Sequence, residues 1–221
     1  MITLKTRETI IDQRDIEEFG REFRARKCAL LKGLLDPELL ALLLPRIEGG
    51  HWGDYVHEGI GTEDVMNDDR ALNLLHFAAN TPAFLDAVRR IADCDNISWF
   101  SGRIYRLVPG AGHYDSWHHD NTDNRLVGMS INLSSGGYEG GLFELRDAES
   151  RALHAQIANT GLGDASLFRI SSSLEHRVGP LTGTRPRTAF AGWFCSGQPD
   201  LLSRLRQAAA ARSANIPTPS A

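Results

Sequence analysis

Apolar residues in the first 95 positions of the chain recur with helical spacing. Ile16, Phe19 and Phe23 lie three or four residues apart, so a helix would present them on one face. A short apolar run at residues 28–32 is typical of a strand instead. Residues 1–95 are therefore predicted to be mostly helical.

Two dipeptides predict further helix starts. Asp36-Pro37 and Thr81-Pro82 each place a capping side chain before a proline at the first helical position. The first of these helices should end near Pro45, because proline lacks the backbone N–H that a helix interior needs. The second carries an apolar stripe that must cover other apolar surface.

Residues 49–70 show no clear periodicity and are predicted to form a long ordered loop or a mobile lid. Loops of this kind often contact substrates. Ordinary packing or a solvated surface is the alternative for each of its side chains. The candidates for a pocket mouth, or for binding a cationic substrate, are His51, Trp52, Tyr55, His57, Asp64, Asp68 and Asp69.

From residue 97 onward the pattern changes to short β-rich runs separated by Gly, Pro, Asn and Asp, which is typical of a sandwich or barrel. The predicted strands span residues 97–108, 126–133, 141–145, 166–170 and 188–194. We expect a single domain over residues 1–221. Its predicted parts are a helical support and lid region at 1–95, a core at 96–198, and a C-terminal helix with a frayed tail at 199–221.

Composition narrows the class of protein. A chain of 221 residues, 42% of them apolar, can bury a full core, and its three cysteines show no pairing motif, which favours a reduced, cytoplasmic setting. We expect no membrane segment, because no signal-peptide pattern or spanning apolar run occurs. The net charge of −4 and the lack of a basic, aromatic-rich stretch argue against nucleic acid as a partner. Oligomeric state is not encoded in these patterns.

One polar segment carries residues suited to metal chemistry. His118 and Asp120 lie two positions apart, so in an extended segment both side chains leave the same face and can bind one ion. His176, on a later β-rich stretch, is the leading candidate for a third ligand. Two imidazoles and one carboxylate leave three positions open, which suits non-haem iron(II). His113 and Asp115 form a second pair with the same spacing, and spacing alone leaves that alternative open.

Several ordered motifs make residues 97–195 resemble the prolyl-hydroxylase-like branch of the 2-oxoglutarate/iron(II) oxygenases. These motifs are Pro109-Gly110, Tyr114, His118-His119-Asp120-Asn121, Ile131-Asn132-Leu133, residues 138–145 and 176–183, Arg187 and Trp193-Phe194. The resemblance implies a mainly β fold with α-helices (α+β), with the N-terminal helices packed on a double-stranded β-helix (jelly-roll) core. It also implies that His118, Asp120 and His176 bind the metal, and that Fe(II), 2-oxoglutarate and O2 are the cofactors.

The resemblance further implies a basic residue for the distal carboxylate of 2-oxoglutarate, shortly after the second histidine. Arg187 is the preferred candidate and Arg185, which shares its strand parity, is the alternative. A guanidinium binds a carboxylate through two hydrogen bonds and keeps its charge when buried. Ala189 stands where the family often has a hydroxyl residue, so another donor must complete the site. The candidates are Tyr105, Arg103 and Asn132, each of which could instead fill the barrel or pair strands.

The reaction implied by the resemblance converts 2-oxoglutarate to succinate and CO2 while an unactivated carbon is hydroxylated. Asp120 favours hydroxylation, because halogenating relatives have a small residue there that leaves room for chloride. The expected substrate is a small molecule or an amino-acid derivative, since the chain has no added recognition domain. The alternatives are the same chemistry on a protein or peptide residue, a desaturation, cyclisation or epimerisation, or a non-catalytic jelly-roll module that binds a metal or ligand.

Overall fold

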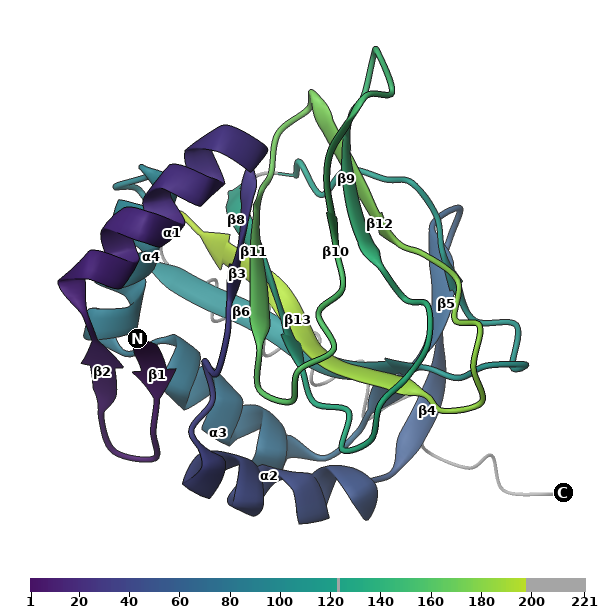
Figure 1. The fold of residues 1–221 in the computed structure, drawn as a ribbon. Coiled ribbons are helices and arrows are strands. Elements are labelled where there is room, and N and C mark those ends of the chain that lie inside the picture. The colour runs from purple at the N-terminus through teal and green to yellow at the C-terminus, as the bar shows by residue number, and fades with distance from the viewer. Residues whose placement is uncertain (123, 198–221) are drawn as a thin grey trace, which may run out of the picture.

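The computed structural model describes residues 1–122 and 124–197, and its main feature is a curled antiparallel sheet (Figure 1). The strands are β3 (Cys28–Leu31), β4 (Trp52–His57), β5 (Gly61–Met66), β6 (Trp99–Leu107), β7 (Tyr114–Asp115), β8 (Arg125–Asn132), β11 (Ala165–Arg169) and β13 (Arg187–Cys195). Their order is β3-β11-β8-β13-β6-β5-β4, and β7 pairs with β5. β13 lies in the middle, where β6 and β8 flank it.

A smaller sheet lies across from this large one. It consists of β9 (Phe143–Asp147), β10 (Leu153–Ile157) and β12 (Leu174–Val178), in the order β10-β9-β12 (Figure 1). The rings of Phe143 on β9 and Phe168 on β11 lie 4.7 Å apart, so apolar side chains join the two sheets. Two antiparallel sheets facing each other in this way confirm the predicted jelly-roll core.

Helices cover the outer face of the large sheet (Figure 1). They are α1 (Gln13–Arg26), α2 (Pro37–Glu48), α3 (Asp69–Ala79) and α4 (Pro82–Ala92), and a small hairpin of β1 (Ile2–Leu4) and β2 (Thr9–Ile11) lies beside them. The ring centroid of Phe84 on α4 lies 5.9 Å from that of Phe194, and the Phe194 centroid lies 4.7 Å from that of Phe100. These rings, all fully buried, tie the helical layer to β6 and β13. Within residues 1–122 and 124–197, no helix is both long enough and apolar enough to cross a bilayer.

Both predicted helix starts are confirmed, since Asp36 caps α2 and α4 begins directly after Thr81. The predicted end of α2 near Pro45 is wrong, because the helix continues to Glu48. Leu43 and Ile47, on either side of the proline, are both buried in the core. We infer that their burial outweighs the hydrogen bond that proline removes.

Residues 49–70 form a hairpin and the start of α3, so the prediction of a loop or lid was wrong. β4 and β5 pair from Trp52↔Met66 to His57↔Gly61, and β5 pairs with β6 at Asp64↔Arg106 and Val65↔Tyr105. β4 is the outermost strand of the sheet and is largely exposed. Its conformation therefore follows from pairing with β5 rather than from a hydrophobic pattern of its own.

The predicted strand at residues 28–32 appears as β3, and the five strands predicted after residue 97 appear as β6, β8, β9, β11 and β13 with small shifts at their ends. β10 and β12 were not predicted as separate strands, although His176 was placed on a β-rich stretch. The C-terminal helix and tail predicted at residues 199–221 lie outside the described residues.

Candidate metal centre and cavity

Backbone pairing brings the three predicted metal ligands together. His118 and Asp120 lie on the segment between β7 and β8, and His176 lies in the middle of β12. The His118 N–H donates to the His176 carbonyl at 3.1 Å, and the His176 N–H donates back at 2.9 Å. One ligand atom from each residue lies within 4.8 Å of the other two. Since metal–ligand bonds are about 2.1 Å long, this spacing fits one ion bound by all three side chains.

A backbone carbonyl orients His118. Its Nδ1 lies 2.8 Å from the carbonyl oxygen of Ser116, which can only accept, so Nδ1 carries the proton. The lone pair is then on Nε2, which lies 3.9 Å from Asp120 Oδ1 and faces the other two ligands. This second contact is the usual way in which a protein fixes the tautomer of a metal-binding histidine.

The Asp120 carboxylate is held from two sides. Trp193 Nε1 donates to its Oδ2 at 2.5 Å, and Arg125 Nη1 donates to its Oδ1 at 3.3 Å. Burial alone would raise the pKa of Asp120, but hydrogen bonds from His176 and Trp193 and the adjacent imidazoles hold that pKa well below its usual range. The group is therefore ionised at neutral pH, as a metal ligand must be.

The alternative pair does not come together at a metal site. Asp115 accepts a hydrogen bond from the Val178 N–H at 2.7 Å, and His113 Nδ1 accepts one from the Val108 N–H at 3.0 Å. His113 instead lies 3.6 Å from Asp64.

Asp54, Asp64 and His113 also form a group whose ligand atoms are close enough for an ion. Asp64 in that group is already paired with Arg106 at 3.0 Å. These residues do not line the cavity beside His118, so they are no part of its metal centre.

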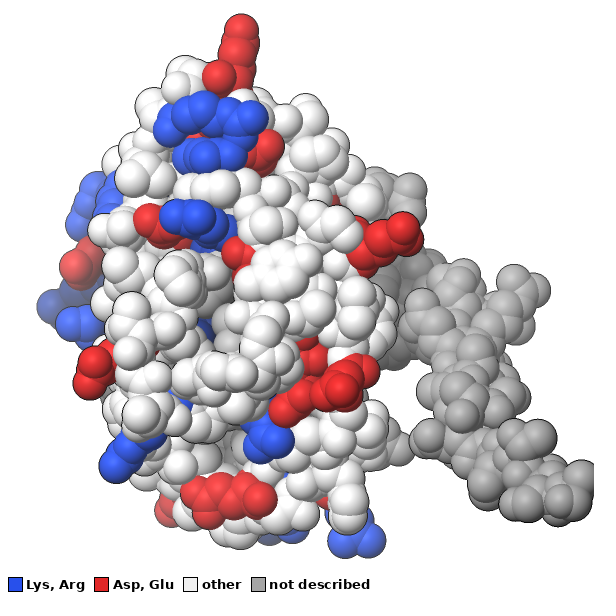
Figure 2. All heavy atoms as spheres, turned by 90° about the vertical axis from the view of Figure 1, so that its right-hand side faces the viewer, with Lys and Arg blue, Asp and Glu red and all other residues white. Residues whose placement is uncertain are grey.

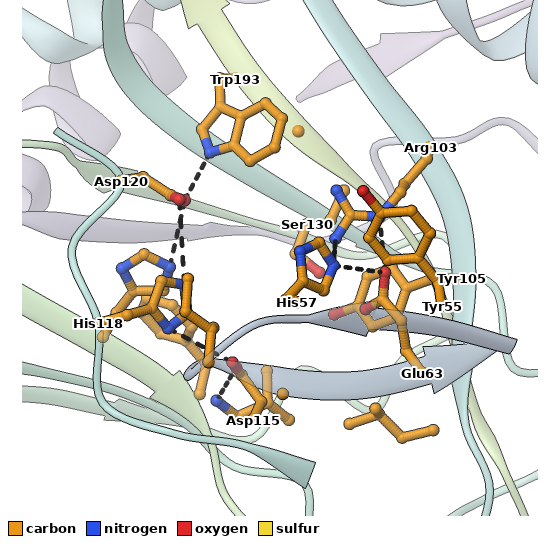
Figure 3. A pocket seen from close by; sticks show the side chains of 18 of the residues that line it. Tyr55, His57, Glu63, Arg103, Tyr105, Asp115, His118, Asp120, Ser130 and Trp193 are labelled. Carbon is orange, nitrogen blue, oxygen red and sulfur yellow. Dashed lines mark hydrogen bonds and ion pairs between the residues drawn. The ribbon is translucent and has the colours of Figure 1, made fainter. Parts of the chain in front are cut away.

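A cavity of about 390 Å³ extends from the three ligands into the space between the sheets. Its wall near the ligands is apolar, since the ring centroids of Phe143 and Phe168 lie 5.9 and 4.6 Å from that of His176. Its far wall is polar and comes from β4, β5 and β6, which contribute Tyr55, His57, Glu63, Arg103 and Tyr105 (Figure 3). A substrate in this space would meet dry surface near the metal and charged groups away from it.

Arg187 lies behind the cavity wall and is only 2% exposed. Its Nη1 donates to the Tyr105 hydroxyl at 2.7 Å, and its Nη2 donates to Ser130 Oγ at 3.1 Å. Burial opposes its charge, but Tyr105 and Tyr138 hold its pKa above the ordinary value. Among the described residues, no carboxylate lies within 4.0 Å of this guanidinium.

The other candidates for the co-substrate site lie in different surroundings. Arg185 is exposed. Asn132 is buried, but its side chain accepts from the Ser134 N–H and donates to the Gly161 carbonyl, so both ends serve the local turn. Tyr105 and Arg103 both line the cavity.

Some predicted contacts from residues 49–70 reach the cavity and others do not. Tyr55 and His57 line it, as expected for a pocket mouth. Asp64 pairs with Arg106, and Asp68 caps α3 by accepting from the Arg70 N–H at 2.7 Å. Neither acidic residue lines the cavity, so they are not placed to bind a cationic substrate there.

Sequence reasoning missed Ser130 and treated Trp193 only as part of a motif. Ser130 lies in a run of buried residues on β8 and looks like ordinary strand interior. Its register with Ala191 on β13 could be known only once the strand order was known.

Comparison with known proteins agrees with this geometry. Residues 102–195 match the family model of the 2OG-Fe(II) oxygenase superfamily. A prolyl-4-hydroxylase of Pseudomonas putida has a similar structure, with a TM-score of 0.63 and 17% identity over 83% of this chain and 100% of its own. No curated protein matches the chain in sequence.

Two further solved structures share the fold. An oxidoreductase of the 2OG-Fe(II) oxygenase family from Burkholderia pseudomallei gives a TM-score of 0.65 at 13% identity, over 88% of this chain and 95% of its own. The epimerase SnoN from nogalamycin biosynthesis gives 0.64 at 14% identity, over 84% of each chain.

The jelly-roll core and the site of two histidines and one carboxylate define a non-haem metal oxygenase. More particularly, residues 102–195 match the model of the 2OG-Fe(II) oxygenase superfamily, and the fold is like that of a prolyl-4-hydroxylase. This confirms the family and the enzyme class expected from the sequence, and with them Fe(II), 2-oxoglutarate and O2 as the cofactors.

Proposed function

We propose that the chain hydroxylates an unactivated carbon of a small molecule or amino-acid derivative, with release of succinate and CO2. The observation that carries this proposal is the buried Arg187 guanidinium, which has no carboxylate partner among the described residues and lies behind the cavity that holds the metal-binding side chains. A buried charge without a counter-ion is costly, so a bound anion would relieve that cost.

The distal carboxylate of 2-oxoglutarate is the anion we assign to Arg187. The hydroxyl groups of Tyr105 and Ser130 already touch the guanidinium and can turn to donate to the same carboxylate. They supply the hydroxyl that the family often has at the position of Ala189. The exposure of Arg185 supports the choice of Arg187 over it.

The protein's own side chains would divide the remaining tasks. His118, Asp120 and His176 hold Fe(II), which supplies the oxidising power for the carbon–hydrogen bond when 2-oxoglutarate and O2 are also present. The apolar residues around the ligands keep water away from the reacting carbon.

The shape of the cavity supports a small substrate. The β4–β5 hairpin contributes Tyr55, His57 and Glu63 to the far wall, so these side chains bound the space on that side. A volume of about 390 Å³ is within the range of small-molecule sites.

Acidic and basic side chains intermix over the face of the molecule that includes this hairpin (Figure 2).

Succinate formation tests the proposal. Purified protein with Fe(II), 2-oxoglutarate and air should form succinate, and His118→Ala should abolish it because a metal ligand is lost. Arg187→Ala should raise the KM for 2-oxoglutarate by about thirtyfold or more, which corresponds to about 2 kcal/mol for a lost buried ionic contact.

The exposed residues His119 and Arg185 provide matched controls for His118 and Arg187. Alanine at either control position should leave succinate formation and the KM for 2-oxoglutarate unchanged. Succinate formation that survives in His118→Ala, or a KM that is insensitive to Arg187→Ala, would contradict the assignment. Product mass separates the possible outcomes, because hydroxylation adds one oxygen atom whereas an epimerase such as SnoN returns a product of unchanged mass.

A further inference from the structure

The far wall of the cavity carries a preformed ion pair. Arg103 Nε donates to Glu63 Oε1 at 2.6 Å, and Arg103 Nη2 donates to His57 Nε2 at 2.7 Å (Figure 3). Because a guanidinium only donates, His57 Nε2 is the acceptor in this contact and cannot also donate to Glu63, although it lies 3.2 Å away. Glu63 is 7% exposed, so this carboxylate is held in place on the wall.

Each member of the pair has one polar atom that is available to bind a ligand. Within the described part of the chain, Arg103 Nη1 and Glu63 Oε2 have no hydrogen-bond partner. Both residues line the cavity. The wall therefore offers one cationic donor and one anionic acceptor side by side.

The indole of Trp193 lies between this pair and the metal centre. Its Nε1 touches Asp120, and Arg103 Cζ lies 5.9 Å from its ring centroid. A molecule lying along the indole can therefore reach the ion pair with one end and the metal centre with the other. Near the metal that molecule would meet apolar side chains such as Phe143 and Phe168, whose rings lie against His176.

We propose that Arg103 and Glu63 bind the carboxylate and the ammonium group of a free L-α-amino acid, whose aliphatic side chain points towards the metal centre. This inference rests on the proposed function and names its substrate class. A zwitterion engages both Arg103 Nη1 and Glu63 Oε2 and adds no net charge to the cavity, whereas a simple acid or amine engages only one of these two atoms and adds a net charge. A blocked amino acid, as found within a peptide, offers neither charge.

The same two strands supply a matched control. Asp64 and Arg106 are the ion pair on the opposite face of β5 and β6, with Arg106 Nε donating to Asp64 Oδ2 at 3.0 Å. Neither residue lines the cavity. Substitution there tests whether any loss of binding comes from the strands in general or from the cavity pair.

The test measures binding without turnover. Anaerobic protein loaded with Fe(II) and 2-oxoglutarate is first screened for a thermal shift with each protein L-amino acid. The tightest aliphatic one is then titrated by calorimetry beside its deaminated acid, its decarboxylated amine and its N-acetyl amide. For leucine these probes are 4-methylpentanoic acid, 3-methylbutylamine and N-acetyl-leucine amide.

The free amino acid should bind at least about tenfold more tightly than each of the three derivatives, because each derivative loses one or both charged contacts. Glu63→Gln should remove the preference over the deaminated acid, and Arg103→Lys should weaken the amino acid by about tenfold. Asp64→Asn and Arg106→Lys should stay within about twofold of wild type.

Equal or tighter binding of the acid, the amine or the amide would overturn the proposal. So would the absence of binding by every aliphatic amino acid to protein that still binds 2-oxoglutarate, although the oxygenase function would then stand. Failure to bind 2-oxoglutarate itself would overturn both. The derivative series needs only the wild-type chain, so it decides the question even where a variant does not fold.

Discussion

At the scale of single residues, the metal centre depends on partners that do not touch the metal. Ser116 fixes the tautomer of His118, and Trp193 and Arg125 hold the two oxygens of Asp120. Arg125 also stacks on the Trp193 ring at 3.5 Å, so the two partners of the carboxylate support each other. The geometry of the ligand set is thus fixed before an ion arrives.

Removal of the indole N–H should therefore weaken metal binding. Trp193→Phe keeps a ring for Arg125 to stack on but loses the donor to Asp120 Oδ2. The dissociation constant for Mn(II), a redox-stable stand-in, should rise by about tenfold or more, as for other partners of metal ligands. A fluorescence or calorimetric titration measures this directly.

The matched control is Trp117→Phe, because Trp117 stacks against Arg146 at 3.8 Å and does not line the cavity. An unchanged Mn(II) affinity in Trp193→Phe, or an equal loss in both variants, would show that the indole N–H does not position Asp120.

The ligand residues were predictable from sequence and their supporting partners were not. His118 and Asp120 are close in the chain, and the strand period puts them on one face. Trp193 and Ser130 reach the site only through the register of β13 against β8, which pairs residues distant in sequence. A local pattern contains no information about such a register.

At the scale of elements, the hairpin of β4 and β5 shapes the cavity, and it is the element that the sequence analysis missed. Its strands carry Gly, Asp, Glu and His, which lower the strand signal. Contact with β6 outweighs these preferences, because Glu63 and Val65 face the cavity side together with Arg103 and Tyr105. Of the polar residues that lower this strand signal, His57 and Glu63 form part of the cavity wall.

The junction of β5 and β7 should not tolerate a side chain at Gly61. A Cβ atom there would lie 2.3 Å from the Tyr114 carbonyl oxygen, so β7 would have to move. Gly61→Ala should lower the free energy of unfolding by about 1–3 kcal/mol. It should also weaken Mn(II) binding, because β7 leads directly into the segment with His118.

Urea unfolding measures the expected loss in the free energy of unfolding of Gly61→Ala. Gly137→Ala is the control, since a Cβ atom at Gly137 has no neighbour within 4 Å. Equal stability of the two variants would mean that β7 can shift at no cost.

At the scale of the whole molecule, the metal centre connects the two sheets. His176 belongs to β12 of the small sheet, whereas the segment with His118 and Asp120 follows β7, which pairs with the large sheet. An ion bound to all three side chains therefore links both halves of the jelly roll. A ligand that binds only the folded state, and not the unfolded state, must stabilise the whole fold.

Saturation with metal and co-substrate should raise the melting temperature. At a ligand concentration about a hundredfold above the dissociation constant, the gain is about 2.7 kcal/mol. For a chain of this size, such a gain corresponds to roughly 5–10 °C. Calorimetry of protein with Mn(II) and 2-oxoglutarate, compared with protein in a chelator, gives the shift.

The shift from Mn(II) alone should vanish in His176→Ala, which removes the ligand contributed by the small sheet. A shift that persists there would indicate that the ion binds elsewhere.

The central strand β13 also limits how the chain can vary. Arg187 at its start and Trp193 near its end lie six positions apart, so both side chains leave the same face of the strand. Any one-residue insertion or deletion between them would reverse that parity and turn one of the two away from the cavity. Relatives that keep both side chains in these places should therefore also keep the number of residues between them, whatever other substitutions the strand accepts.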